Sequence, residues 1–240
     1  MMKQERAVRT RQLLIRSAAE AFERHGFIRA RLADISSSAG VTTGALHFHF
    51  ANKEALASTV EATAAVILRH AAHSVQRPGA NALQRLTGAS HALADRLRHD
   101  VVARAGFRLS CGDGPHRGAL DLRGEWFECI RHLLTEAGDH NLLAEGVARQ
   151  DAAASIAAAT TGFEVLGRTD PAWLSPASLS RFWRLTLPRL ATAEALAALG
   201  LPAGDPAPPS TRCGDFGKQK LTELSSSGRS PVTLPGSARA

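Results

Sequence analysis

Apolar side chains in this chain recur at the spacing of an α-helix, and this periodicity constrains the fold more than any other feature. Leu14, Ala18 and Phe22 follow one another at intervals of four residues, with charged side chains between them. Residues four apart lie on one face of a helix, so such a segment buries one face and exposes the other. No run of alternating apolar and polar residues demands a β-strand. The sequence therefore predicts an all-α protein.

Glycine, proline and capping residues divide the chain into separate predicted helices. Gly26 is expected to end the first helix and Thr42 to cap the third, while RPGAN separates two long helices. Residues 111–118 are expected to form a loop because they contain three glycines and a proline. The predicted helices cover about residues 7–25, 31–38, 43–50, 52–74, 82–110 (bent near Asp100), 119–137, 149–167 and 177–199.

These helices group into an N-terminal three-helix domain, residues 1–51, and a larger helical domain, residues 52–200. The chain of 240 residues suits this division, and its 44% of apolar residues suffice to build a core. Residues 201–240 are rich in Pro, Gly and Ser, so we expect a disordered tail.

The net charge of +7 is concentrated at the N-terminal end of the chain. Residues 1–53 contain nine Lys and Arg against four Asp and Glu, whereas residues 54–199 contain fifteen of each kind. A basic head on a neutral body suits contact with a polyanion, although a solvated basic surface has the same composition.

Cysteine usage and the N-terminal residues indicate a protein of the reducing cytoplasm. Cys111, Cys129 and Cys213 are odd in number and widely spaced, which argues against a disulfide framework and a zinc cluster. No apolar segment follows the N-terminal charges, and no run reaches the roughly 18 apolar residues of a membrane helix. No cofactor or metal site is predicted, since His47 and His49, two apart, do not share a helix face.

The segment VTTGALHFHFANK has an unusual composition for a surface helix. Gly44 weakens a helix interior by about 1 kcal/mol relative to alanine, and two histidines follow it closely. Two short helices joined by a glycine-containing turn and packed on a preceding helix form a helix-turn-helix unit, whose second helix enters the DNA major groove. In such a unit Leu46 and Phe50 face the core, while Thr43 and His47 share the exposed face.

This geometry assigns roles to the side chains around the second short helix. Gly44 permits close approach to DNA, the helix N-terminus attracts phosphate, and His49 and Lys53 lie beside the groove. A basic arm close by consists of Lys3, Arg6, Arg9 and Arg11. The predicted DNA contacts are Arg6, Arg9, Arg31, Thr42, Thr43, Gly44, His47, Phe48, His49 and Lys53.

Several short motifs follow one another within about residues 7–56. They are Phe22, Gly26-Phe27, Ala39-Gly40-Val41, Gly44, Leu46-His47, His49-Phe50 and Lys53. This set resembles the DNA-binding segment of the TetR family of bacterial repressors. The resemblance implies a homodimer that meets a palindromic operator in double-stranded DNA, with the last two helices of each chain forming the dimer interface.

The chain departs from the family pattern at two positions. His47 replaces the usual tyrosine, and Ala30-Arg31 replaces the usual threonine cap, which weakens that cap and adds a candidate phosphate contact. Histidine gains its charge near neutral pH. We therefore hypothesise that DNA affinity rises as the pH falls; an operator affinity that stays constant between about pH 6 and about pH 8 would remove this hypothesis.

Beyond the N-terminal domain, RAGFRLSCG followed by a loop and GEW is similar to the γ-butyrolactone receptor branch of the family. TTGALHFHF also resembles that branch, and the tryptophan of its ligand pocket corresponds to Trp126. Members of the branch repress antibiotic biosynthesis, and their more basic relatives, called pseudo-receptors, answer to antibiotics or biosynthetic intermediates. The resemblance implies a small-molecule effector, and the basic excess of this chain favours a pseudo-receptor.

The predicted ligand-binding residues are Trp126, Phe107, Thr160, Thr161 and Phe163. An aromatic at helical spacing is also a common core residue, so Trp126 carries both interpretations. A buried threonine hydroxyl needs a partner, and either a backbone carbonyl one turn earlier or a ligand supplies it. Three further side chains line either the same cavity or the core: Cys111, Cys129 and Phe127.

Two alternative functions remain open from the sequence. A helical enzyme would need a nucleophile elbow, a phosphate loop, a zinc motif or paired carboxylates, and the chain contains no such pattern. The loop that begins at Ser110 is the one place for a nucleophile, and no base accompanies it. A dimeric repressor without any ligand is the second alternative.

Overall fold

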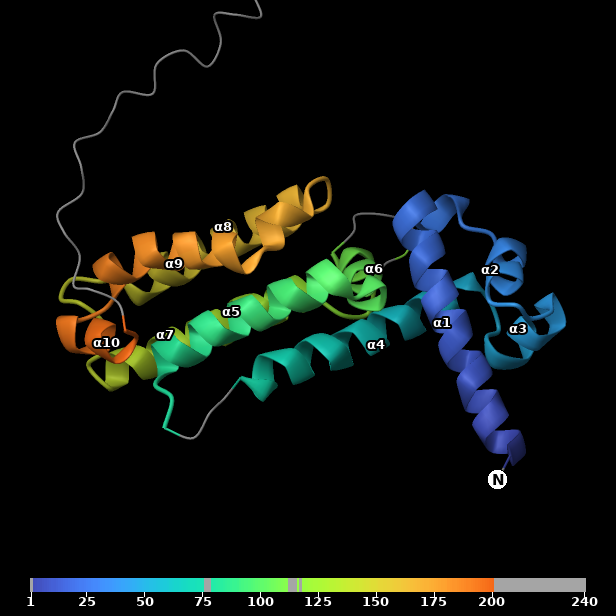
Figure 1. The fold of residues 1–240 in the computed structure, drawn as a ribbon, viewed down its shortest axis with the longest axis horizontal. Helices are drawn as coiled ribbons and strands as arrows, with labels where there is room; N and C mark the ends of the chain where they lie inside the picture. Colours follow the sequence, from blue (N-terminus) through green and yellow to red (C-terminus); the bar gives the residue numbers. More distant parts are fainter. Residues whose placement is uncertain (1, 76–78, 112–115, 117, 201–240) are drawn as a thin grey trace, which may run out of the picture. The chain divides into compact units, whose positions relative to one another are not determined.

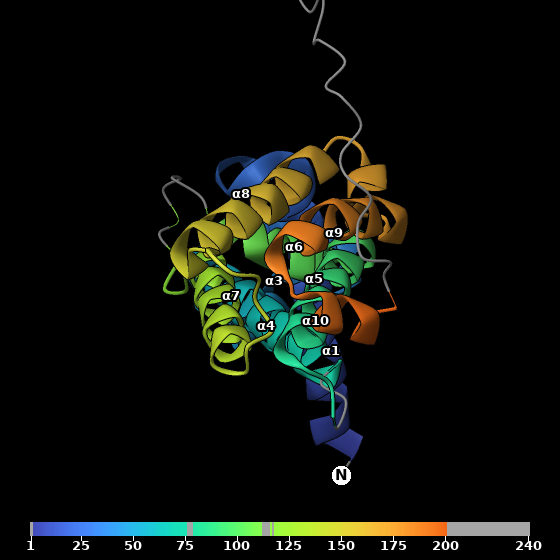
Figure 2. The same cartoon turned by 90° about the vertical axis from the view of Figure 1, so that its left-hand side faces the viewer.

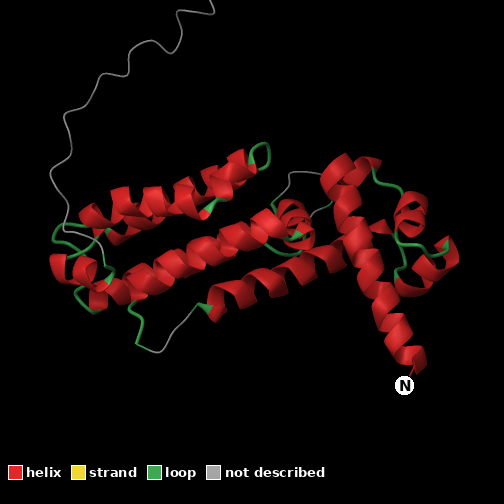
Figure 3. Cartoon of the chain, viewed as in Figure 1, coloured by secondary structure: helices red, strands yellow, loops and turns green. Residues whose placement is uncertain are grey.

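The structure is a computed structural model and describes residues 2–75, 79–111, 116 and 118–200. The predicted tail, residues 201–240, lies outside these ranges, as does most of the predicted loop. The described part of the chain is helical throughout, with one isolated bridge between Leu143 and Ala191 (Figure 3). This agrees with the all-α prediction.

Ten α-helices and one 3₁₀-helix (η1) follow one another along the described residues (Figure 1). We call α1 to α3 the head and α4 to α10 the body. The elements are α1 (Met2–Arg29), α2 (Leu32–Ser38), α3 (Thr43–His49), α4 (Lys53–Ser74), α5 (Ala82–His99), α6 (Val101–Ser110), α7 (Leu122–Asp139), α8 (Arg149–Gly167), η1 (Pro171–Leu174), α9 (Pro176–Leu190) and α10 (Ala193–Ala198).

Gly26 interrupts the first helix, as the sequence predicts. Its backbone has φ 73° and ψ 164°. This conformation lies outside the helical region, and its positive φ favours glycine. The helix begins at Met2, five residues before the predicted start. Glu5 lies in the first turn, where a carboxylate interacts favourably with the helix dipole.

Two predicted helices are each divided in the structure. The predicted bend near Asp100 is a complete break, because this carboxylate accepts hydrogen bonds from the backbone nitrogens of Val102 (2.8 Å) and Ala103 (3.1 Å) and starts α6. The prediction of a single helix for residues 177–199 is wrong. Helix α9 ends at Leu190, and Thr192 then caps a separate helix, α10.

The head packs on the N-terminal half of α4 and on α6. Its buried core consists mainly of Leu14, Ala18, Phe22, Ile35, Leu46, Phe50, Leu56, Val60 and Leu109. Burial of one such large apolar side chain contributes about 1.5–3 kcal/mol, so these residues hold three short helices in place. The long helices α4 and α6 therefore belong to the core of the head as well as to the body.

A close helix crossing joins α4 and α6. A Cβ atom added to Gly106 would lie 2.3 Å from the Cβ of Ala64 and 2.8 Å from the carbonyl oxygen of Val60. Only glycine fits this crossing without a shift of the backbone.

The body has its own core between α5, α7, α8 and α9. It contains Leu83, Leu86, Ile130, Leu134, Ile156, Trp183 and Leu187, all nearly inaccessible to solvent. Figures 1 and 2 show α8 and α9 on the same side of α5, and the rings of Phe163 and Phe182 meet between them with centroids 5.6 Å apart.

Candidate nucleic-acid interface and ligand cavity

Helix α3 has one buried face and one exposed face. Leu46 and Phe50 are 0% and 4% exposed and anchor the helix in the head core. The opposite face is exposed and carries the predicted contact residues Thr42, Thr43, Gly44, His47 and Phe48. Phe48 is 82% exposed on this face.

Local hydrogen bonds fix the start of α3. The Thr42 hydroxyl accepts a hydrogen bond from the backbone nitrogen of Ala45 at 3.1 Å, so Thr42 is the predicted cap. The hydroxyl groups of Thr43 and Ser36 lie 3.3 Å apart and link α3 to α2. These bonds hold the end of the helix that carries the exposed residues.

Packing inside the protein does not require a glycine at position 44. A Cβ atom there would meet only the Thr42 hydroxyl oxygen, at an ordinary distance of 3.9 Å. Because glycine also weakens a helix, neither packing nor helix formation accounts for a glycine at this exposed position.

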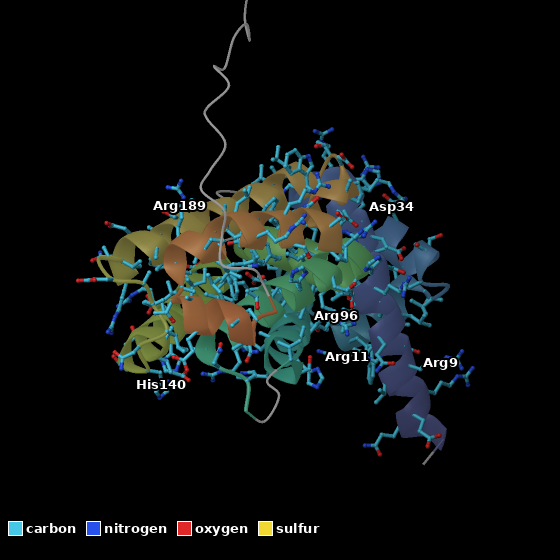
Figure 4. The ribbon with its side chains drawn as sticks, turned by 60° about the vertical axis from the view of Figure 1, so that its left-hand side comes forward. Arg9, Arg11, Asp34, Arg96, His140 and Arg189 are labelled. Atoms are coloured by element: carbon cyan, nitrogen blue, oxygen red, sulfur yellow. The ribbon has the colours of Figure 1, made fainter. Side chains whose placement is uncertain are left out.

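The basic residues of α1 differ in their surroundings. Arg6 and Arg9 are exposed, and Figure 4 shows Arg9 and Arg11 projecting from opposite sides of the helix. The Arg11 guanidinium lies 5.4 Å from the centre of the Phe50 ring, a cation–π contact with the residue that follows α3. The side chain of Lys3 lies outside the described part of the chain.

Arg31 directly precedes α2, and His49 is the last residue of α3. Arg31 is exposed and precedes α2 without a side-chain capping bond, as the departure from the family pattern predicts. His49 is half-buried, and its ring meets that of Phe48 edge to face with centroids 5.2 Å apart.

Lys53 is held within the protein, which the sequence did not reveal. Its ammonium group donates hydrogen bonds to the carbonyl oxygens of Ile28 (3.1 Å) and Ala30 (3.2 Å), and lies 4.7 Å from the centre of the Phe27 ring. These contacts tether Lys53 to the end of α1, and its contact with the DNA backbone stays a prediction. Carbonyls at a helix end lack intrahelical partners, and Lys53 supplies one.

All five predicted ligand-binding residues lie around one narrow slot. It has a volume of about 50 Å³ and lies between α5, α6, α7, α8 and α9. A second, larger cavity of about 830 Å³ lies between α4, α5 and α7 and includes Phe127 and Cys129. Trp126 and Leu93 line both spaces, and we call these two side chains the partition between them.

One hydrogen bond holds this partition in place. The indole nitrogen of Trp126 donates to the Thr160 hydroxyl at 2.9 Å. The same hydroxyl lies within hydrogen-bond distance of the carbonyl oxygens of Ile156 (2.9 Å) and Ala157 (3.1 Å). The carbonyl partner considered for Thr160 from the sequence is therefore present, and the hydroxyl faces Trp126 as well.

Charged residues line the larger cavity in a way that the sequence did not signal. Arg69 and Glu125 form a bidentate pair at 2.8 and 2.6 Å, and Arg85 pairs with Glu136. The partners of these pairs are more than fifty residues apart in the chain. No local pattern joins them, so only the packing of α4 and α5 against α7 brings them together.

The two described cysteines are not activated as nucleophiles. Burial raises the pKa of both the Cys111 and the Cys129 thiol, which favours the neutral form. The Ser110 hydroxyl donates to the carbonyl of Phe107 at 2.9 Å. Among the described residues, no group of three or more His, Cys, Asp and Glu is placed to hold a metal ion.

No helix in the described part of the chain combines the length and apolar character needed to cross a membrane.

A helix-turn-helix unit with an exposed polar face is joined here to a helical body with a mostly apolar cavity. This combination defines a class of proteins: DNA-binding regulators that carry their own sensor domain.

Comparison with known proteins identifies the family. The profile of "Bacterial regulatory proteins, tetR family" matches residues 14–60. The A-factor receptor protein of Streptomyces griseus is 32% identical over 194 residues, which cover 80% of this chain and 67% of that protein. The chain therefore belongs to the TetR family of bacterial transcriptional regulators, in the branch that contains the γ-butyrolactone receptors.

Solved structures agree with this assignment. The crystal structure of a γ-butyrolactone receptor, an ArpA-like protein, superposes with a TM-score of 0.70 at 27% identity, over 80% of this chain and 94% of that one. CprB from Streptomyces coelicolor, a TetR family protein in complex with its biological operator sequence, superposes with a TM-score of 0.67 at 27% identity, again over 80% of this chain and 94% of that one.

Proposed function

We propose that this protein is a dimeric repressor that binds a palindromic operator through α3 and is released by a small molecule. The observation that carries the proposal is the two-faced character of α3, where buried Leu46 and Phe50 support an exposed row of polar residues. Residue types that contact phosphate and base edges gather on this face. The protein acts in the cytoplasm, where its DNA target lies.

A dimer brings two copies of α3 to one side of a DNA duplex. Recognition helices in such dimers enter successive major grooves about 34–36 Å apart, which explains why operators are palindromic. The exposed apolar residues on α8 and α9 support these helices as the dimer interface: Val165, Leu166 and Leu185, the last of them 78% exposed. Exposed alanines such as Ala154 and Ala158 allow two helices to approach closely.

The larger cavity is the proposed effector site. Its volume of about 830 Å³ lies within the range of small-molecule pockets, about 300–1,000 Å³, whereas the slot of about 50 Å³ is too small by itself. A shift of the Trp126 indole would join the two spaces. We propose a γ-butyrolactone-like signal or an antibiotic as the effector, with antibiotic or secondary-metabolite genes as the targets.

Helix α6 supplies the mechanical connection between effector and DNA. Arg104 donates to Glu23 of α1 at 2.6 and 3.2 Å and to the carbonyls of Leu97 and Arg98 at the end of α5. Phe107, one turn further along α6, lines the slot. If α6 has two positions and the ligand binds one of them more tightly, binding shifts the equilibrium toward that position. The shift moves α1, and with it α3.

Selection from random duplexes tests DNA binding without knowledge of the operator. The full-length protein is expected to enrich a palindrome whose half-sites are about one helical turn apart, and binding weakens steeply with salt. Culture extracts of the source organism are then added to mobility shifts with the selected duplex. Release supports the proposal, whereas binding that no extract reverses favours the repressor without a ligand, and failure to enrich any sequence removes both.

Trp126→Ala separates sensing from DNA binding. The variant loses the indole of the partition and its hydrogen bond to Thr160, so release by the active extract is expected to need about tenfold more effector, while operator affinity stays unchanged. Thr135→Ala, an exposed change on the same helix, is the control. Loss of operator binding in Trp126→Ala would instead identify Trp126 as a packing residue.

A further inference from the structure

A group of arginines surrounds the end of the slot at the junction of head and body. Four guanidinium groups, from α6, α7 and the residue that follows α8, meet two carboxylates, one from α1 and one from α8. We call this group the arginine cluster: Arg104, Arg108, Arg123 and Arg168 with Glu23 and Glu164. Among the described residues the cluster has an excess of two positive charges.

Two of these arginines are poorly paired. Arg104 and Arg168 form close bidentate pairs with their carboxylates, at distances of 2.6 to 3.2 Å. Arg108 lies 3.9 Å from Glu23 and Arg123 lies 3.6 Å from Glu164, too far for direct hydrogen bonds.

The poorly paired arginines are also partly removed from water. The Nε atom of Arg123 is buried and has no hydrogen-bond partner. Burial lowers the pKa of the Arg108 guanidinium, and the attraction of Glu23 compensates only in part. A buried donor without an acceptor is costly, so this arrangement favours binding of an additional anion.

The arginine cluster opens on the slot. Arg123 and Glu164 line the slot directly, and the Arg123 guanidinium lies 5.9 Å from the centre of the Phe107 ring. Most of the remaining wall is apolar, with Leu93, Leu97 and Leu174 among its residues. The slot thus has apolar walls and one charged end, where Arg123 and Glu164 connect it to the arginine cluster with its excess of two positive charges.

We propose that the arginine cluster binds the carboxylate head of an effector whose apolar body extends past Trp126 into the larger cavity. This inference rests on the proposed function and narrows it from neutral lactones and aromatic antibiotics to acidic, amphipathic ligands. Arginine holds a carboxylate through paired hydrogen bonds, and Arg123 has a donor free for this purpose. The head of the ligand competes with Glu164 for Arg123. Because Arg108 interacts with both Glu164 and Glu23, this competition is expected to extend to the contact between α6 and α1.

Calorimetric titration of the full-length protein without DNA tests this site, with octanoate, neutral octanamide and inorganic phosphate as probes. Octanoate is expected to bind about tenfold more tightly than octanamide, although an apolar slot alone prefers the amide. Equal affinities for the two, or phosphate that binds more tightly than octanoate, would overturn the proposal.

Three variants and a control sharpen the test. Glu164→Gln removes the competing carboxylate, so octanoate binds about tenfold more tightly while octanamide is unaffected. Arg123→Gln abolishes the preference for octanoate and Arg123→Lys, which keeps the charge, retains part of it. Arg96→Gln, an exposed change on α5, leaves all affinities unchanged. Glu164→Gln that binds octanoate no better than the original protein contradicts the proposal even if the Arg123→Gln variant does not fold.

Mobility shifts with the selected operator keep this inference separate from the proposed function. Octanoate that binds with the expected preference but releases no DNA supports the anion site and counts against the regulatory role. An active extract whose effector is neutral and equally potent on the Arg123→Gln variant overturns the anion site and leaves the repressor function intact.

Discussion

The head and the body present their proposed functional side chains in opposite ways. In the head, Thr43, Gly44 and His47 lie on one exposed face of a seven-residue helix, and residues close in sequence support them. In the body, Trp126 and Thr160 are half-buried and meet across 34 residues of chain. A surface made by one short helix can be recognised from local sequence, whereas a cavity made by five helices depends on their packing.

The same glycine-to-alanine change tests both regions, and its largest effect is expected in the body. In Gly106→Ala the new methyl group would lie 2.3 Å from the Cβ of Ala64 and close to the Val60 carbonyl, so α6 must move away from α4. We expect a loss of about 1–3 kcal/mol in the free energy of unfolding, measured by urea denaturation. A variant as stable as the original protein would show that the crossing adapts easily.

Lys53→Met tests whether this lysine is a tether or a phosphate contact. The loss of its hydrogen bonds to Ile28 and Ala30, at a partly exposed site, is expected to lower stability by about 1 kcal/mol. As a tether, Lys53 affects all DNA sequences equally and leaves the salt dependence of binding unchanged. A direct phosphate contact would instead leave stability unchanged and make the plot of log binding constant against log salt concentration less steep by about 0.9.

Gly44→Ala is the counterpart of Gly106→Ala in the head. The added methyl group meets only the Thr42 hydroxyl oxygen, at an ordinary contact distance, and alanine favours the helix, so stability rises by about 0.5–1 kcal/mol. Operator binding is expected to weaken nevertheless, because the methyl group separates α3 from the groove. Mobility shifts and denaturation of the same sample measure both effects, and unchanged operator affinity contradicts the proposed close approach.

His47 carries the smallest and most specific expected effect. His47→Ala alters the preference among operators, as a side chain that reads bases should, and an unaltered preference discredits that role.

Local signals predicted much of the fold and of the head. Gly26, Thr42 and Asn52 act at the helix ends as their residue types suggest, because caps and left-handed glycines need only neighbouring residues. The division near Leu190 was missed. Ala191 leaves the helix to pair with Leu143 of a distant loop, and no local pattern encodes such a contact.

The body shows where local reasoning stops. Trp126, Phe107 and Phe163 were proposed as pocket residues, and they do surround one slot. The sequence did not indicate that Arg123 and Glu164 meet at one end of the slot, since these residues are 41 positions apart in the chain, or that a larger cavity adjoins the slot. Charges of this kind are recognised only once the helices are packed.

The order of the residues by itself determined a helical chain with a DNA-reading head, because helix periodicity, caps and the pattern around α3 act over a few residues. Tertiary structure alone decided what the body can hold. The volume of a cavity and the balance of charge at its end arise from side chains that meet only when α5 to α8 pack together.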